Sequence, residues 1–286
     1  MDEKRAALAQ KIKTRLRLRP LRLPVDRPAV NIVLLVLTVL STYVTGGLWY
    51  CIAIMAILLF HEMGHYVMCR RYGVPATLPF FIPLPVLNPF GTMGAVIQMH
   101  GQMPSRRALF DIGAAGPLAG FIISLPAVYY GMLHSEVVHI QSAEMPGFYL
   151  GESLLFRIIS LIVFGSLPDD YDTVLHPLAY AGWAGLFVTS LNLLPIGQLD
   201  GGHIVYSLFG KRSAQIHLVF IIVLGGLAVV YPGWALLFVL LLLYGRTHPP
   251  ALDEVMPLDA KRKILAIAIF LIFLLSFTPI PFKLSR

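Results

Sequence analysis

Charged side chains are scarce in this sequence. Only 13% of its 286 residues are Asp, Glu, Lys or Arg, whereas 57% are hydrophobic and the mean hydropathy is +0.75. Soluble domains carry about 25% charged residues and roughly 45–50% apolar ones. The composition therefore excludes an ordinary water-soluble globule and predicts a chain built from membrane spans of roughly 20 residues each.

Cysteine is also nearly absent. The two cysteines, Cys51 and Cys69, both lie in or beside apolar stretches. This pattern excludes a small secreted fold held together by disulfides, and we interpret both residues as inert core thiols.

Acidic residues are outnumbered, which gives a formal net charge of +7. Residues 1–27 hold nine of the 22 Lys and Arg residues and three acids. We interpret residues 1–28 as an uncleaved, basic cytoplasmic segment that touches anionic lipid. The basic residues stand where membrane orientation would place them, so no nucleic-acid partner is expected. Residues 29–286 would form the membrane domain.

The apolar run from Ala29 to Phe60 is too long for a single span. Its 32 residues would extend about 48 Å as a helix, whereas one crossing needs about 30 Å. Gly46-Gly47 is the natural break. We therefore predict an all-α polytopic membrane protein of about six or seven transmembrane helices. The candidate spans are residues 29–45, 48–69, 108–131, 177–195, 215–230, 233–245 and 263–280. The two short segments around residues 231–233 fit either a tight hairpin or one bent helix.

Residues 150–167 decide the topology. A crossing here would export the basic residues near positions 211 and 261, whereas a segment that lies flat or dips part way would keep them on the side of the N-terminus. The positive-inside rule favours the second arrangement. The loop 132–176 carries six acids and one arginine, so we expect it to be extracytoplasmic.

An HExxH motif, His61-Glu62-Met63-Gly64-His65, stands within the second predicted span. Two histidines four residues apart lie on the same face of a helix and can share one metal ion, while Glu62 can reach a water on that metal. Ionisable residues are costly inside an apolar helix and usually functional there. A polar cluster that only links helices by hydrogen bonds is the weaker alternative.

A third ligand must come from elsewhere, because catalytic zinc takes three protein ligands and keeps one open position. Asp200 ends an apolar span and is followed by two glycines, which permit tight turns and close approach by another helix. With no nearby Lys or Arg, this acid needs a cation, and a zinc ion on the two histidines would supply it. Asp111 is the competing acid, but two arginines precede it closely, so we interpret it as an interfacial residue at a helix start.

The pairing of HEMGH with NLLPIGQLDGG about 135 residues later resembles the site-2 protease family of intramembrane zinc metalloproteases. That family combines HExxH with NxxPxxxLDG, and both halves match. The sequences of residues 151–155 (GESLL) and 176–203 resemble those of the chloroplast and cyanobacterial branch of the family. The likeness covers nearly the whole chain from the first span onward.

The resemblance implies one catalytic Zn²⁺ ion and a role for each matching residue. His61, His65 and Asp200 would be the zinc ligands. Glu62 would be the base that activates water, and Asn192 would stabilise the oxyanion or orient the scissile carbonyl. An asparagine that only makes interhelical hydrogen bonds is the alternative for Asn192.

Residues 88–99 resemble the re-entrant β-loop of the same family. Alternation after Gly94 fits a strand to which an unwound substrate could add at the edge. The expected substrate-binding residues are Gly91, Gly94 and Val96, and a plain cytoplasmic loop is the alternative. The small residues 115–120 match another stretch of these proteases and are expected to serve close helix packing.

The implied function is hydrolysis of peptide bonds within transmembrane segments of membrane-anchored substrates. The expected partners are a transmembrane protein or peptide and the lipid bilayer. The cell membrane of a bacterium or archaeon is the favoured location, with a thylakoid or plastid membrane as the alternative. The loop 132–176 is too short for a PDZ domain and no further domain follows residue 286, so screening of substrates by such a domain is not expected.

Three other functions compete with this one. A membrane metal transporter is disfavoured because it would give no function to Glu62 or to the LDGG element. A catalytically silent scaffold that binds helices would not need the complete ligand set. A CAAX-type membrane protease uses a downstream Glu as its third ligand, which the LDGG carboxylate disfavours. The natural substrate and the oligomeric state stay open at this point.

Overall fold

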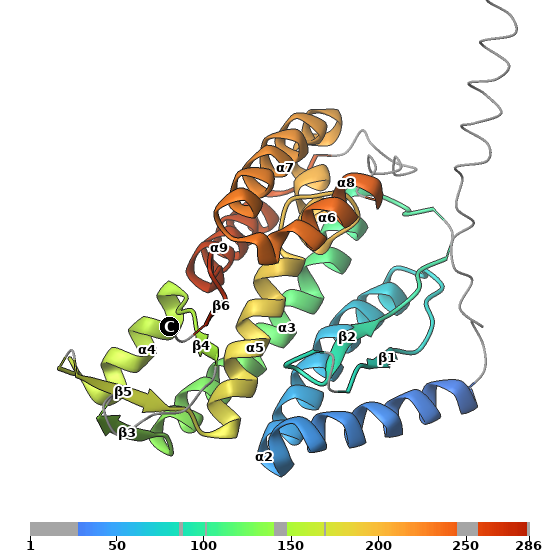
Figure 1. Cartoon of the computed structure of the whole chain (residues 1–286). Helices are drawn as coiled ribbons and strands as arrows, with labels where there is room; N and C mark the ends of the chain where they lie inside the picture. Colours follow the sequence, from blue (N-terminus) through green and yellow to red (C-terminus); the bar gives the residue numbers. More distant parts are fainter. Residues whose placement is uncertain are drawn as a thin grey trace, which may run out of the picture.

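The computed structural model describes residues 28–85, 88–100, 102–139, 148–168, 170–244 and 257–284. The basic segment 1–27 lies outside these residues, so the prediction made for it stays a prediction. The described chain is mainly helical, with three small two-stranded antiparallel sheets (Figure 1).

The first described helix, α2 (Pro28–Arg71), consists of two helices joined at a sharp kink. Gly47 has φ 75° and ψ −170°, a backbone conformation that glycine adopts without a steric penalty. The predicted break at Gly46-Gly47 is therefore confirmed. Figure 1 shows the first half of α2 turning back sharply into the second half.

The remaining helices follow the predicted apolar segments, except α6, which lies between two of them and was not predicted. They are α3 (Arg106–Leu133), α4 (Leu154–Phe164), α5 (Pro177–Asn192), α6 (Asp200–Phe209), α7 (Ser213–Val230), α8 (Ala235–Tyr244) and α9 (Ala260–Ser276). Short 3-10 turns stand before α7 (Gly210–Arg212) and before α8 (Pro232–Trp234). The ring of Phe238 packs against Gly225, so α7 and α8 form a hairpin rather than one bent helix.

Among the described residues, three helical runs are long and apolar enough to cross a membrane. They are Pro28–Arg71, Arg106–Leu133 and Asp200–Val230, the last of which joins α6 and α7. Helix α4 has 11 residues and is about 16 Å long, roughly half of a bilayer crossing. This length agrees with the prediction that residues 150–167 do not span.

Helices α2, α3 and α5 pack together at the centre of the molecule. Their buried side chains include Tyr50, Ile54, Val128 and Trp183. A second apolar cluster joins α3 and α5 to α6, α7 and α9 (Figure 1). The outer faces of α2 and α7 expose many large apolar side chains, which suits contact with lipid rather than water.

The strands β1 (Phe80–Pro83) and β2 (Thr92–Val96) form an antiparallel hairpin beside α2. Phe80 pairs with Val96, and both Phe80 and Phe81 are buried. Further toward its base the hairpin continues through a hydrogen bond from the Thr77 amide to the Gln98 carbonyl. A strand is thus present at Thr92–Val96, so these residues are not a plain loop. The strand predicted after Gly94 overlaps its last two residues, and entry of the hairpin into the membrane stays a prediction.

Two sheets were not foreseen from the sequence. Strand β3 (Glu136–His139) pairs with β5 (Tyr171–Val174) within the acidic loop. Strand β4 (Phe148–Leu150) pairs with β6 (Phe282–Leu284), which follows α9. The second pairing brings the last described strand to the same end of the molecule as the loop 132–176.

Candidate metal centre

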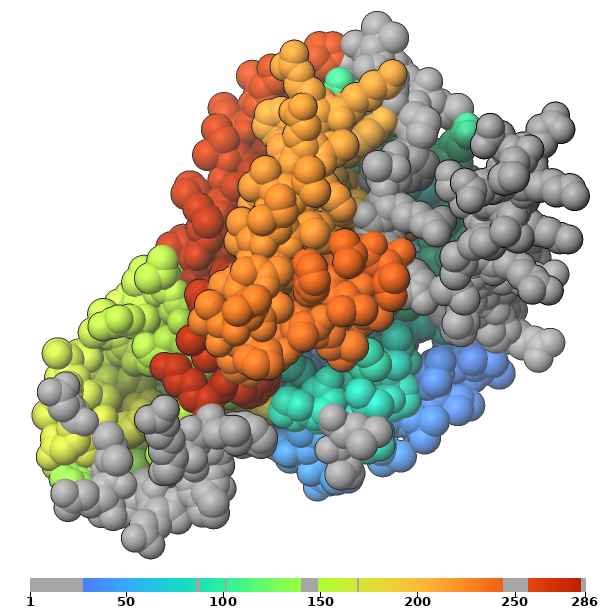
Figure 2. All heavy atoms as spheres, turned by 45° about the horizontal axis from the view of Figure 1, so that its top comes forward, coloured from blue at the N-terminus to red at the C-terminus, as the bar shows by residue number. Residues whose placement is uncertain are grey.

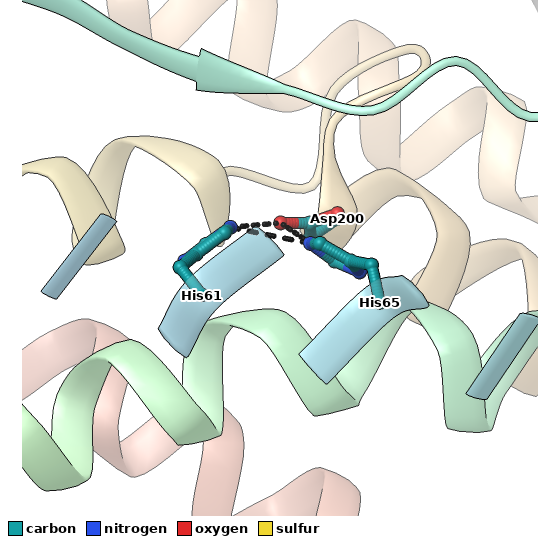
Figure 3. A group of neighbouring side chains, drawn as sticks. All are labelled: His61, His65 and Asp200. Atoms are coloured by element: carbon teal, nitrogen blue, oxygen red, sulfur yellow. Dashed lines mark hydrogen bonds and ion pairs between the residues drawn. The ribbon is translucent and has the colours of Figure 1, made fainter. Parts of the chain in front are cut away.

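Three side chains from two distant parts of the chain converge on one point. His61 and His65 lie on the second half of α2, and Asp200 is the first residue of α6. The two Nε2 atoms are 3.2 Å apart, and each lies 3.3 Å from Oδ2 of Asp200. Figure 3 shows the carboxylate of Asp200 pointing toward both imidazoles, with a teal strand of the hairpin crossing the same view.

These distances fit one tetrahedral metal ion. Zinc binds imidazole nitrogen at about 2.0–2.1 Å and carboxylate oxygen at about 2.0–2.2 Å, so neighbouring ligand atoms of a tetrahedral site stand about 3.3–3.5 Å apart. The three measured separations of 3.2, 3.3 and 3.3 Å match that spacing. Within the part of the chain that the structure describes, this is the group of His, Cys, Asp or Glu residues able to hold a metal.

The backbone of α3 orients one of the imidazoles. Nδ1 of His65 donates a hydrogen bond to the carbonyl oxygen of Ile112, with 2.8 Å between the two atoms. Because Nδ1 then carries the proton, Nε2 keeps its lone pair and points it toward His61 and Asp200. This carbonyl was invisible to sequence reasoning, since a backbone group has no residue-type signal.

Glycines of α3 make the room that the imidazoles occupy. A Cβ atom on Gly116 would overlap the ring of His65, and one on Gly120 would stand 3.2 Å from Nδ1 of His61. A Cβ atom on Gly64 of α2 would likewise stand 2.5 Å from the carbonyl oxygen of Ala115. The predicted close packing of residues 115–120 is confirmed. The structure adds that the packing partners are the two histidines themselves.

A tight turn delivers Asp200 to the site. Helix α5 ends at Asn192, and α6 begins at Asp200 after seven residues. Gly201 and Gly202 pack against backbone carbonyls of that turn, so the close approach at these glycines comes from the chain's own preceding turn. The amide of Gly197 donates to Nδ1 of His217 on α7 at 2.9 Å, which ties the turn to the next helix.

Glu62 and Asn192 border the same point. Glu62 is buried, and the backbone of Ile97, just after β2, lies beside its carboxyl group. The side-chain amide of Asn192 lies 3.3 Å from Nε2 of His61. Asn192 does link two helices, as its alternative interpretation required, but its partner is a candidate metal ligand. Its role in catalysis stays a prediction.

Asp111 belongs to a different cluster. Arg262 at the start of α9 donates to Asp111 through Nε at 2.8 Å, and the hydroxyl of Tyr72 donates to the same carboxylate. Asp111 therefore stands apart from the metal group, as predicted, although its cation comes from α9. The neighbouring Arg106 instead donates to the carbonyl of Ser207. Burial, and then the hydrogen bond to Asp111, raises the pKa of Tyr72 above its ordinary value.

The three predicted substrate-binding residues differ in their surroundings. Gly91 has φ 69° and packs against the side chain of Thr45, so it faces α2. Gly94 has φ 96° with open space where a Cβ would stand, and the side chain of Val96 is 41% exposed. The open part of the hairpin is therefore the stretch from Met93 to Val96.

Comparison with known proteins agrees with this geometry. Residues 49–231 match the family model described as Peptidase family M50. The chain belongs to this family. The matched M50 region runs from the second half of α2 to the residue after α7 and contains both motifs that form the metal group.

Curated M50-like relatives carry zinc metalloprotease names. The chain is 34% identical over 241 residues to "Probable zinc metalloprotease EGY1, chloroplastic" of Oryza sativa subsp. japonica, covering 82% of this chain and 41% of that protein. It is 32% identical over 246 residues to the protein of the same name from Arabidopsis thaliana, covering 84% and 44%. Against "Probable zinc metalloprotease EGY2, chloroplastic" of Arabidopsis thaliana the identity is 29% over 227 residues, covering 79% and 40%. The chain thus spans less than half the length of these relatives.

Proposed function

We propose that this M50 chain is an intramembrane zinc metalloprotease that hydrolyses peptide bonds within transmembrane segments of membrane-anchored substrates. The observation that carries the proposal is the triangle of ligand atoms from His61, His65 and Asp200, whose edges suit a tetrahedral zinc ion. The zinc metalloprotease names of its relatives support the same chemistry. A zinc ion held there supplies Lewis acidity toward a carbonyl group and toward water.

Glu62 is the proposed general base. It neighbours His61 on the helix, is buried, and lies beside the backbone of Ile97. From this position its carboxylate takes a proton from the attacking water and passes it to the leaving amine. Asn192 offers an amide N–H beside the same point, where it can stabilise a developing oxyanion.

The membrane arrangement that we propose has seven crossings. Pairing of β4 with β6 supports it, because the chain after α9 returns to the end of the molecule that holds the acidic loop. A cytoplasmic N-terminus then requires an odd number of crossings: two halves of α2, then α3, α5 with α6, α7, α8 and α9. Helix α8 is as short as α4, but it is counted because α7, with 18 residues, crosses and the basic residues at the start of α9 must return to the side of Lys211. The cluster of Tyr72, Asp111 and Arg262 supports a shared cytoplasmic end for α2, α3 and α9.

The hairpin β1–β2 is proposed to re-enter the membrane from the cytoplasmic side and to receive the unwound substrate along the open stretch of residues 93–96. In Figure 2 the teal hairpin lies at the surface between α2 (blue) and α8 (deep orange), where a substrate helix could approach from the lipid. His61 lies nine residues from Arg70, about 14 Å along the helix, so water is proposed to enter from the cytoplasm.

We further propose that residues 29–286 form one protease domain in a multi-pass membrane protein. The favoured location is the cell membrane of a bacterium or archaeon. The word "chloroplastic" in the names of the relatives supports a thylakoid or plastid membrane as the alternative.

The test is cleavage of single-span proteins in detergent with zinc, by the unmodified chain beside Glu62→Gln. We expect cutting within the span by the unmodified chain, and none by Glu62→Gln although this variant keeps its zinc. Turnover by pure Glu62→Gln would refute the base assignment. Metal flux in liposomes without any cleavage would instead indicate a transporter.

A further inference from the structure

The turn of the hairpin is fastened to the helices through its backbone. Three consecutive carbonyl oxygens each accept a hydrogen bond from a hydroxyl group on a different helical segment. The pairs are Tyr180 Oη to Pro89 O (2.8 Å), Tyr50 Oη to Phe90 O (2.9 Å) and Ser41 Oγ to Gly91 O (2.5 Å). The donors come from α5, from the second half of α2 and from its first half respectively.

Two of the three hydroxyls are shielded from water, whereas the hydrogen bond from Tyr180 to Pro89 lies at the surface. Tyr50 is fully buried and Ser41 is 5% exposed. The ring of Phe90 adds apolar contacts, with its centroid 6.1 Å from that of Trp183 and 6.2 Å from that of Phe187. Loss of the Tyr50 hydroxyl would remove the donor of the partly buried Phe90 carbonyl, at a cost in desolvation, whereas the Gly91 carbonyl also accepts a hydrogen bond from the Leu84 amide (3.1 Å). Tyr50 therefore contributes most to holding the turn in this one position.

The fastened turn is connected directly to the candidate metal centre. Strand β2 starts after Gly91, and the backbone of Ile97, just after the strand, lies beside Glu62. Six residues separate these two points, about 20 Å of extended chain. On α2, Tyr50 lies 11 residues before His61, about 16 Å along the helix axis. The strand therefore runs from the fastened turn at residues 89–91 to a backbone position beside Glu62, the proposed base.

We infer that Ser41, Tyr50 and Tyr180 are positioning residues that clamp the turn of the hairpin and so fix the register in which an extended substrate meets the metal centre. They touch neither substrate nor metal and act through the backbone of residues 89–91. The inference rests on the proposed protease function. It follows from strand geometry. If the hairpin strand shifts by one or two residues relative to the metal centre, a different peptide bond of the paired substrate lies at that centre.

The clamp predicts a specific kinetic change when a hydroxyl is removed. A loose hairpin must be ordered each time substrate binds, and that cost falls equally on the bound state and the transition state. Tyr50→Phe is therefore expected to raise KM about three- to tenfold, and Tyr180→Phe, whose hydrogen bond lies at the surface, to raise it by less, with kcat of both within about twofold of the unmodified chain. The double variant should also cut at additional bonds one or two residues from the main site.

A purely structural role would give a different result. Loss of folded protein lowers kcat in proportion to the active fraction and leaves KM and the cleavage position unchanged. Zinc content serves as the folding check for each variant. Tyr43→Phe is the matched control: Tyr43 lies on the same half of α2 as Ser41, is 52% exposed, and its hydroxyl makes no hydrogen bond to another described residue.

A second measurement does not depend on activity. Met93 is 64% exposed on the open stretch, and the chain's two cysteines are buried, so Met93→Cys accepts a nitroxide label selectively. We expect a slow, single-component electron paramagnetic resonance spectrum that gains a fast component when Tyr50→Phe and Tyr180→Phe are added. It should stay unchanged with Tyr43→Phe.

The outcomes separate the two proposals. If the unmodified chain cuts no test protein, the protease proposal falls, while label mobility still decides whether the clamp exists. If the chain is active and the double variant keeps its KM, its cleavage position and its label mobility, the clamp is refuted. Raised KM, spread cleavage and a mobile label together would support it.

Discussion

Replacing Gly116 by alanine should weaken metal binding without removing any ligand. The added Cβ would overlap the imidazole of His65, and neither partner can move freely, because Nδ1 of His65 is bonded to the Ile112 carbonyl of the same helix. Overpacking of this kind costs about 1–3 kcal/mol. If His65 shifts to relieve the overlap, that energy is lost from metal binding, which corresponds to a decrease in zinc affinity of about 5- to 140-fold.

The chain offers a graded series for this experiment. At Gly120 the added Cβ would stand 3.2 Å from Nδ1 of His61, a tight contact rather than an overlap, so Gly120→Ala should have a smaller effect. At Gly226 on α7 nothing lies within 4 Å of the added atom. Gly226→Ala is therefore the control, expected to leave zinc affinity unchanged and to raise the free energy of unfolding by about 0.4–1 kcal/mol.

The assay is competition for zinc between each purified variant and a chromogenic chelator, with thermal unfolding recorded in parallel. The expected order of zinc affinity is Gly226→Ala equal to the unmodified chain, then Gly120→Ala, then Gly116→Ala. A Gly116→Ala protein that binds zinc as tightly as the unmodified chain would refute the view that α3 presses directly on the ligand.

Three further predictions concern the ligands, the metal and the charged cluster. Asp200→Ala and His65→Ala should lose zinc, and normal zinc occupancy in a metal assay of either would exclude that residue as a ligand. Treatment with a strong chelator should abolish cleavage of a single-span substrate, and added zinc should restore it; activity that survives verified metal removal would contradict a metalloprotease. Arg262→Met should lower the free energy of unfolding by about 1–3 kcal/mol in a thermal melt, because it strips the half-buried Asp111 carboxylate of its cation. Lys261→Met is the matched control, and equal losses in both would show that the ion pair does not stabilise the fold.

Sequence patterns were sufficient to predict those features of the fold and the site that depend on the type of residue. The spacing of His61 and His65 predicts that they share one face of a helix. The pair Gly46-Gly47 predicts a break in an apolar run that is too long for one span. Both appear in the structure. Asp200 could be selected because an acid without a nearby base needs a cation, and the structure places it against both histidines.

The features that sequence could not give depend on backbone groups or on distant pairings. The Ile112 carbonyl and the backbone of Ile97 act at the site without any side-chain signal. The partner of Asp111 lies 151 residues away, whereas sequence proximity pointed to Arg106 and Arg107. Strands β4 and β6 have three residues each, which is too short for alternating polar and apolar residues to reveal a strand in the sequence.

The last described strand has a practical consequence for engineering this protein. The ring of Phe282 lies 5.9 Å from that of Phe90, in the turn of the hairpin, and 5.6 Å from that of Trp183 on α5. A truncation before β6 would thus remove Phe282 from the aromatic cluster that surrounds the turn of the hairpin. Phe282 and the turn are more than 190 residues apart in the sequence. Affinity tags for purification are better separated from residue 284 by a long flexible linker, and activities measured on shortened chains should be compared with the full-length chain.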